Sequence, residues 1–282
     1  MTRCTCAAIF LAAMLLAPTA LAEGHGPVFA LATPTLGKGG ASSDTVMMGL
    51  RTEDGSAPTT LGQMFGYGLN EDLQFNFRFP LGRSGRAEGL LPNMRSGMMG
   101  APRATEAQLM WRFHRRAPAI GTRRESTLHV SIATPDQPQR RDLNAGESLN
   151  VAVATGYASR QTYWWLSAGA ETHREKRGDQ LGDLYYAGAV FGYRPNLFRG
   201  DDAPLDFRWF AEVVAEFPQS DQRDGQTLTD TGGRRLLAGP SFLALSGPWG
   251  LSGGVLFPLH EDMNAAEPDE RYRAKLVVTY WF

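Results

Sequence analysis

The sequence contains 282 residues, of which 43% are hydrophobic and 20% are charged, so it is long enough for one large domain or two small ones. Its formal net charge of −1 gives no electrostatic basis for binding nucleic acid. After residue 22 there is no run of about eighteen apolar residues, which excludes transmembrane helices. A secreted globular enzyme is still compatible with these numbers, so the order of segments along the chain has to decide the fold class.

The N-terminus has the three parts of a cleaved signal peptide, which we predict over residues 1–22. Arg3 supplies the positive charge, residues 7–17 form a short apolar region, and the small residues at 20–22 form a cleavage site. Both cysteines of the chain lie within this segment. The exported chain is therefore expected to have no disulfide and no thiol for catalysis or metal binding.

The remainder of the chain divides into a short extension and twelve segments of strand length. Residues 23–40 are rich in Gly and Pro without a steady period, and we expect them to form a periplasmic N-terminal extension. Each later segment has about ten residues, the length that a tilted membrane strand needs. We predict strands near residues 41–51, 60–69, 72–81, 104–114, 124–134, 148–158, 161–172, 184–194, 206–217, 233–244, 248–258 and 271–282.

Several of these segments alternate between apolar and polar residues. Successive side chains of a strand point to opposite faces, so alternation suits a strand between lipid and a wet interior. Residues 72–81 follow this rule, with Phe77 and Arg78 on opposite faces, and residues 206–217 repeat it. The pattern predicts an all-β fold: a transmembrane antiparallel up-and-down β-barrel of about twelve strands over residues 41–282.

The alternation between apolar and polar residues is clearest in the last segment, residues 271–282. One of its faces carries Leu276 and Phe282, while the other carries Arg271, Arg273 and Lys275. A lipid-facing surface would penalise those three charges and a wet interior would not. A final strand that ends in Phe resembles the signal by which bacterial outer-membrane barrels are recognised, so we expect the barrel-insertion machinery as a partner.

The connections between the predicted strands are mostly long and short in turn. Short periplasmic turns that alternate with longer extracellular loops are typical of outer-membrane barrels with both termini in the periplasm. Residues 195–205 break this rule. The longest connection, residues 82–103, is rich in Met and Arg, and we expect it to gate the channel or to contact anionic lipopolysaccharide.

Polar residues on the inward faces are the candidate solute pathway, because charges inside a barrel can select or orient a solute. The alternative is that they form a salt-bridge network that fills a narrow lumen. The candidates are Arg78, Gln108, Arg112, His129, Arg208, Glu212, Glu216, Arg273 and Lys275.

Aromatic residues follow several of the short turns, where amphipathic rings suit the membrane interface. We predict that they anchor the barrel in the membrane and assist its insertion. They are Tyr163, Trp164, Trp165, Trp209, Trp249, Tyr280 and Phe282.

Catalysis and metal binding are weaker alternatives. His129 and Ser131 share a strand face, but the sequence offers no third group to orient them as a lipid-modifying enzyme would need. The thioethers of Met94, Met98 and Met99 are soft ligands that suit Cu(I), although Met in loops also makes adaptable apolar contacts. We therefore predict no catalytic residue, no metal site and no cofactor.

Two short motifs carry a family resemblance. Residues 65–81 read as a strand, a turn and a strand that ends in Pro-Leu, and residues 34–39 precede the first strand. Together with Phe282 they resemble outer-membrane transporter-like proteins named for the meta-pathway of phenol degradation. The resemblance implies a barrel of about twelve strands and passage of small aromatic or apolar compounds, without a catalytic residue. The loop at 82–103 and the opening at 25–27 also look like barrels found beside heavy-metal handling systems, which makes copper a runner-up substrate.

Together these patterns predict a monomeric outer-membrane channel that passes small solutes passively and is not an enzyme. Its expected partners are outer-membrane lipids, lipopolysaccharide and the solute, and not nucleic acid. A lipid-modifying barrel and a structural envelope protein remain as alternatives.

Overall fold

The computed structural model describes most of the chain after its first 25 residues. The described residues are 26–53, 55, 57–84, 104–134, 143–144, 146–198, 205–266 and 269–282.

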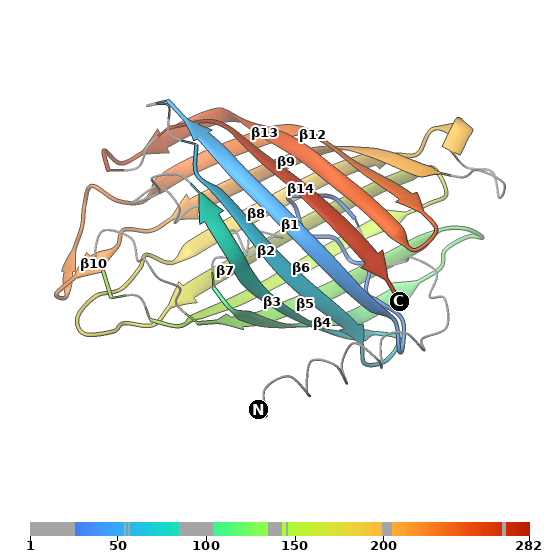
Figure 1. The fold of residues 1–282 in the computed structure, drawn as a ribbon, viewed down its shortest axis with the longest axis horizontal. Helices are drawn as coiled ribbons and strands as arrows, with labels where there is room; N and C mark the ends of the chain where they lie inside the picture. Colours follow the sequence, from blue (N-terminus) through green and yellow to red (C-terminus); the bar gives the residue numbers. More distant parts are fainter. Residues whose placement is uncertain are drawn as a thin grey trace, which may run out of the picture.

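Within these residues, twelve long strands close into one antiparallel barrel (Figure 1). Each strand overlaps one of the twelve segments expected from the sequence, which confirms the predicted fold class. No helix among the described residues is long and apolar enough to cross a membrane. The barrel strands are β1 (Ala41–Thr52), β2 (Thr59–Gly68), β3 (Leu73–Ser84), β4 (Glu106–Arg116), β5 (Arg123–Ala133), β6 (Ser148–Ala158), β7 (Thr162–His173), β8 (Leu184–Tyr193), β9 (Asp206–Pro218), β12 (Gly233–Ser246), β13 (Trp249–Met263) and β14 (Glu270–Trp281).

Each strand pairs with its neighbours along the chain, and β1 pairs with β14 to close the cylinder. Two small elements lie in connections: the hairpin β10 (Gln222–Arg223) and β11 (Gln226–Thr227), and the 3₁₀ turn η3 (Asn196–Phe198). Figure 1 places β10 at the opposite end of the barrel from the C-terminus. The sequence did not predict either element.

The faces of the strands follow the alternation in the sequence. Leu276 is exposed on the outside of β14, whereas Arg273 and Lys275 are buried inside. On β3, Phe77 is exposed and Arg78 is buried. A protein in water rarely exposes so continuous an apolar surface, but a barrel in lipid requires one.

Arg271 differs from the expectation that it shares a face with Arg273. The pairing of β1 with β14 shifts at Arg51 and Thr52, so that Thr52 lies opposite Glu270. A bulge of this kind adds one residue and reverses the faces beyond it. Arg271 therefore points outward to Glu53, with 3.2 Å between the charged atoms, and Glu270 takes the inward position.

The two ends of the barrel differ in their connections. We call the end with residues 69–72, 117–122, 159–161, 194–198 and 247–248 the turn end, and the opposite end the loop end. Gly247 lies in a two-residue hairpin with a φ of 55°, which suits Gly before Pro in a type II′ turn. In bacterial barrels the tight turns face the periplasm. Of the expected gate at residues 82–103, residues 82–84 belong to β3 and residues 85–103 lie outside the described residues.

The part of the N-terminal extension that the structure describes enters the barrel, in contrast to the periplasmic position expected for it. Val28, Phe29, Leu31 and Leu36 are all buried. Phe29 packs with residues of β9, β12 and β13, and Leu31 packs with residues of β7 and β9. Burying these four apolar side chains against the interior of the barrel is more favourable than exposing them to water. We call residues 26–36 the inserted segment.

Candidate functional site

The inserted segment is held chiefly by one carboxylate. Glu212 of β9 points inward and accepts hydrogen bonds from the backbone N–H groups of Val28, Phe29 and Ala30, at 2.7, 2.9 and 2.8 Å. The hydroxyl of Ser241 donates to the same carboxylate. Successive N–H groups that converge on an anion form a backbone nest. Glu212 therefore satisfies three neighbouring donors that have no strand partner inside the barrel.

Lys275 completes this attachment from β14. Its Nζ donates to the carbonyl oxygen of Val28 at 2.9 Å, and the side chain is almost fully buried. A buried cation is stable only when it is paired and hydrogen bonded. We call Glu212, Ser241 and Lys275 the latch, because they hold both the donors and the acceptor of one short stretch of backbone.

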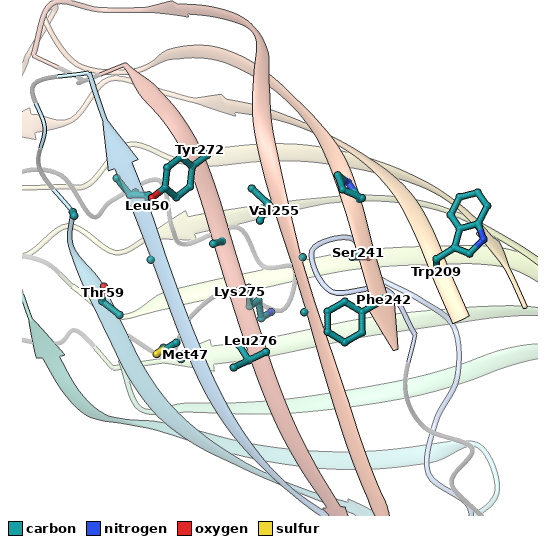
Figure 2. Close-up of a pocket in the computed structure, with 16 residues that line it drawn as sticks. Met47, Leu50, Thr59, Trp209, Ser241, Phe242, Val255, Tyr272, Lys275 and Leu276 are labelled. Atoms are coloured by element: carbon teal, nitrogen blue, oxygen red, sulfur yellow. The ribbon is translucent and has the colours of Figure 1, made fainter. Parts of the chain in front are cut away.

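A groove lies on the outside of the barrel wall directly behind the latch (Figure 2). Its volume is about 730 Å³, and its floor includes Ser241 and Lys275. The pairing of β12 with β13 is interrupted beside it at Gly239 and Pro240, where Pro lacks an N–H group. Small outward residues open the groove and large apolar residues border it. They are Gly49, Thr59, Gly253, Val255 and Ala274, bordered by Met47, Trp209, Phe242, Tyr272 and Leu276.

A second group of contacts holds the segment nearer its end, at Thr33. The hydroxyl of Thr127 donates to the carbonyl oxygen of Thr33 at 2.6 Å. The hydroxyl of Thr33 accepts from Nε1 of Trp165 at 3.1 Å and donates to Glu125 at 3.4 Å. The segment is thus bonded to β5 and β7 as well as to β9 and β14.

A chain of amides extends this network along β3 and β4. The N–H of Leu36 donates to Oε1 of Gln74 at 2.6 Å. Gln74 then donates to Asn76 at 2.6 Å, and Asn76 donates to Gln108 at 2.8 Å. Gln108, one of the predicted pathway residues, is therefore part of the network that supports the inserted segment.

Towards the loop end the interior is ionic. Arg273 binds both carboxylate oxygens of Glu216, at 2.7 and 3.1 Å, and also binds Glu270 at 2.8 Å. Arg235 binds Glu270 and Glu261. Planar guanidinium groups suit such two-point pairing with carboxylates. Three carboxylates face two guanidiniums in this cluster, so its formal charge is −1.

The remaining predicted cations are also paired. Arg78 lies 2.5 Å from Glu106, and Arg112 lies 3.0 Å from Asp72 and 3.2 Å from Glu125. These pairs join neighbouring strands or bridge a turn. These pairs are compatible with both alternatives, the salt-bridge network and the charged solute pathway.

Arg208 lies at the turn end and is less buried than the other predicted pathway residues. It contacts both oxygens of Asp206, at 3.1 and 2.6 Å, and its guanidinium lies over the ring of Tyr163, 5.2 Å from the centroid. Desolvated cation–π contacts of this kind are favourable.

His129 points into the barrel, as expected, and lines a small cavity beside the inserted segment. The cavity has a volume of about 60 Å³ and is also lined by Asn76, Gln108 and Met110. Ser131 is buried on the same strand, but no hydrogen bond joins it to His129 in the described part of the chain. The arrangement therefore has no base and nucleophile in contact.

Methionines occur both in the loop considered as a soft-ligand site and on the first strand. Met94, Met98 and Met99 lie outside the described residues. Met47 faces outward, while Met48 is buried inside the barrel. No group of three or more His, Cys, Asp or Glu side chains suited to a metal ion occurs among the described residues.

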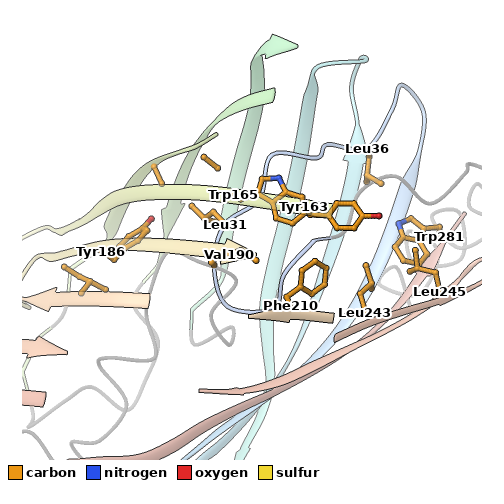
Figure 3. Close-up of a cluster of buried hydrophobic side chains, with 14 residues drawn as sticks. Leu31, Leu36, Tyr163, Trp165, Tyr186, Val190, Phe210, Leu243, Leu245 and Trp281 are labelled. Atoms are coloured by element: carbon orange, nitrogen blue, oxygen red, sulfur yellow. The ribbon is translucent and has the colours of Figure 1, made fainter. Parts of the chain in front are cut away.

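Two of the predicted membrane anchors lie inside the barrel instead. Tyr163 and Trp165 are 5% and 3% exposed, their rings stack with centroids 5.8 Å apart, and both contact Phe210 (Figure 3). Trp164 takes the outward position between them and is 40% exposed. Three consecutive residues of a strand cannot all face lipid, so the period-two rule could have identified this error.

The other predicted anchors lie at the outer surface of the turn end. Trp209 and Trp249 are exposed, and the rings of Trp249, Tyr280 and Phe282 contact one another with centroids 4.7 and 4.9 Å apart. Their positions suit an interfacial aromatic belt.

The inward aromatic residues give the lumen a second chemical character. Figure 3 shows Tyr163, Trp165, Phe210, Leu243 and Trp281 around the inserted segment. Most of this apolar band lies towards the turn end, while the ionic cluster lies towards the loop end. The lumen thus combines an apolar part with a charged part.

A closed antiparallel barrel of twelve strands with an apolar exterior and a charged, partly apolar interior is the architecture of an outer-membrane β-barrel, and this chain has that architecture. No family model matches the chain, and no curated protein matches it. Among solved structures, it is similar to an outer membrane channel from Pseudomonas putida F1. The identity is 15% and the TM-score 0.57, and the match covers 92% of this chain and 99% of that one. This similarity shows a shared fold.

Two further solved structures match with lower TM-scores. The NanC porin has 6% identity and a TM-score of 0.46, over 85% of this chain and 98% of that one. LpxR from Salmonella typhimurium has 10% identity and a TM-score of 0.43, over 86% of this chain and 100% of that one.

Proposed function

We propose that the protein is a monomeric outer-membrane channel for passive passage of small solutes, and that its solutes are small aromatic or apolar compounds. The observation that carries this proposal is the apolar band inside the barrel. A lumen built only to conduct ions has no need for Tyr163, Trp165 and Phe210 on its inner wall, 5.8 to 6.3 Å apart by ring centroids. Aromatic rings offer favourable edge and stacking contacts to another ring.

Passage of solutes through the lumen depends on the position of the inserted segment. It occupies the same part of the lumen as the apolar band and is attached by the latch and by Thr33. These are hydrogen bonds to individual side chains and not a continuous strand ladder, so the segment can leave without opening the barrel wall. Solutes then pass when the segment shifts or withdraws. A gate formed by residues 82–103 stays a separate prediction.

The direct test is solute flux into proteoliposomes that contain the purified protein. We expect an aromatic carboxylate such as benzoate to enter several-fold faster than gluconate, a sugar acid of the same charge. Phe210→Asn should reduce this preference, because a polar amide would interrupt the apolar band. Phe217→Asn is the matched control, since Phe217 faces outward on the same strand. Equal slow entry of both solutes with wild-type protein would refute the proposal.

The remaining alternatives have less support. A lipid-modifying enzyme that uses His129 would need its substrate to reach a cavity of about 60 Å³ behind the inserted segment. A role in copper handling depends on methionines outside the described residues. Growth of a deletion strain on aromatic compounds, and its sensitivity to copper, would distinguish these alternatives from a structural envelope role, which predicts altered envelope integrity only.

A further inference from the structure

Two arginines lie side by side on the outer surface at the turn end. Arg116 of β4 and Arg124 of β5 are directly opposite each other in the strand register, and both are exposed. Like charges at opposed positions destabilise a sheet. An arrangement of this kind is favourable when an anion lies between the two guanidiniums.

A third arginine approaches them from the neighbouring turn. Arg160 lies between β6 and β7, and its side chain crosses to the β4–β5 turn at Gly121. A Cβ atom on Gly121 would lie 2.8 Å from Nε of Arg160, so the Arg160 side chain passes directly against this glycine. Gly121 also has a φ of 73°, which glycine adopts without strain. The two turns thus bring Arg160 towards Arg116 and Arg124.

These arginines have no acidic partner nearby. The residues at 113–124 and 154–166, which include all three arginines, contain no Asp or Glu, and Glu125, the next residue along the chain, is buried on the inward face of β5. Glu125 and Asp72, the carboxylates of the adjoining strand and turn, both bind Arg112. In the described part of the chain, Arg116, Arg124 and Arg160 form no ion pair, so their charge is available to a ligand.

A row of aromatic residues continues from this site across the outer surface of the barrel. Along the same register row, Arg124 lies opposite Tyr157, Tyr157 opposite Trp164, and Trp164 opposite Phe191. The rings of Tyr157 and Trp164 stack at 6.5 Å, and Trp164 and Phe191 are exposed. Exposed aromatic residues near the ends of membrane strands lie at the level of the lipid headgroups. Arg116 ends β4 and Arg124 is the second residue of β5, so these arginines lie beside the connecting turn at the turn end, on the headgroup side of the apolar exterior.

We infer that Arg116, Arg124 and Arg160 bind the phosphate of an anionic glycerophospholipid in the leaflet at the turn end. Guanidinium groups bind phosphate oxygens in two-point geometry, and basic residues at a membrane surface attract anionic lipid. The lipid glycerol and acyl chains would then follow the apolar outer face above the aromatic row. The aromatic row favours a lipid over free phosphate as the ligand, because a site for free phosphate would not require aromatic residues beside it.

The test is lipid retention by the purified protein, measured by native mass spectrometry after exchange into mixtures of phosphatidylglycerol and phosphatidylethanolamine. We expect the wild-type protein to retain phosphatidylglycerol at least about five-fold over phosphatidylethanolamine, and the triple variant R116Q/R124Q/R160Q to lose that preference. Millimolar inorganic phosphate should not displace the lipid.

The matched control is R174Q/R234Q/R271Q, which removes three exposed arginines at the loop end that already pair with Glu147, Asp262 and Glu53. It should retain the wild-type preference. If the triple variant does not fold, as judged by gel mobility before and after heating, the single variants R116Q and R124Q give the same comparison. Equal retention of both lipids by the wild type, or wild-type retention by the folded variants, would overturn the inference. Displacement by phosphate alone would show a free-anion site and overturn it too.

Discussion

At the scale of single residues, Glu212 is the side chain that holds residues 28–30 of the inserted segment in position. Burying a carboxylate is unfavourable unless its oxygens are hydrogen bonded, and Glu212 receives three backbone donors and one hydroxyl. Removing it would leave three adjacent N–H groups without an acceptor. Each buried donor without a partner costs about 1–3 kcal/mol, so loss of this one side chain would weaken the attachment of residues 28–30.

We expect Glu212→Ala to release residues 28–30 from the wall. Since about 1.4 kcal/mol corresponds to a tenfold change in an equilibrium constant, amide hydrogen exchange in this stretch should accelerate by at least about tenfold. Glu216→Ala serves as the control, because Glu216 shares the face of Glu212 but binds Arg273. Unchanged exchange in Glu212→Ala would show that the latch does not hold the segment.

Arg273 has the corresponding role in the ionic cluster. Its replacement by Met would leave Glu216 and Glu270 buried without their guanidinium, and breaking a buried ion pair from one side costs about 3–5 kcal/mol. We expect the urea midpoint of Arg273→Met in detergent to fall accordingly. Arg271→Met should change stability by less than about 1 kcal/mol, since its pair with Glu53 is exposed. Similar midpoints for the two variants would contradict the assigned roles.

At the scale of strands, segment length, the spacing of the connections and the alternation seen in several segments together placed all twelve barrel strands. These signals are local, because the two faces of a strand are set by the residues of that strand alone. Arg78, Glu212 and Lys275 could be assigned to the interior from sequence for this reason. The rule failed at Tyr163 and Trp165 only because residue type was given more weight than periodicity. Arg271 could not be placed, since its face depends on a bulge opposite Arg51 and Thr52.

The loops at the loop end form a contact that involves Asp179. Asp179 accepts hydrogen bonds from the backbone and side-chain amide of Asn144, at 2.8 and 2.9 Å, and from the backbone N–H of Asp224 at 3.1 Å. The backbone bonds from Asn144 and Asp224 lower the pKa of the Asp179 carboxyl below its ordinary value. The charged form is the one that joins the three loops.

This contact should depend on pH. Because the pKa is lower in the folded protein than in the unfolded chain, ionised Asp179 stabilises the contact at pH values above the ordinary value of 3.8, and this stabilisation is lost as the pH falls through the lowered pKa. Hydrogen exchange at Asn144 and Asp224, corrected for the intrinsic pH dependence, should stay slow from pH 7 to about pH 4 and accelerate at lower pH. Asp179→Asn should lose this pH dependence. Constant protection of the wild type down to pH 2 would contradict the assignment.

At the scale of the whole molecule, the barrel could be predicted from local sequence patterns, whereas the position of the inserted segment depends on long-range contacts. The contacts between Val28 and Glu212 and between Val28 and Lys275 join residues 184 and 247 positions apart. No local pattern in residues 23–40 indicates them, because the latch and the apolar band come together only after the barrel has closed. The sequence therefore predicted the barrel but not the segment that occupies its lumen.

The central claim is that the inserted segment closes the lumen and that its latch controls opening. Planar-bilayer conductance of the purified protein tests this most directly, with wild type compared to Glu212→Ala and to a chain that lacks residues 26–36. We predict rare, small openings for the wild type, frequent openings for Glu212→Ala, and a steadily open channel for the deletion. A folded deletion variant that conducts no more than the wild type would contradict the account.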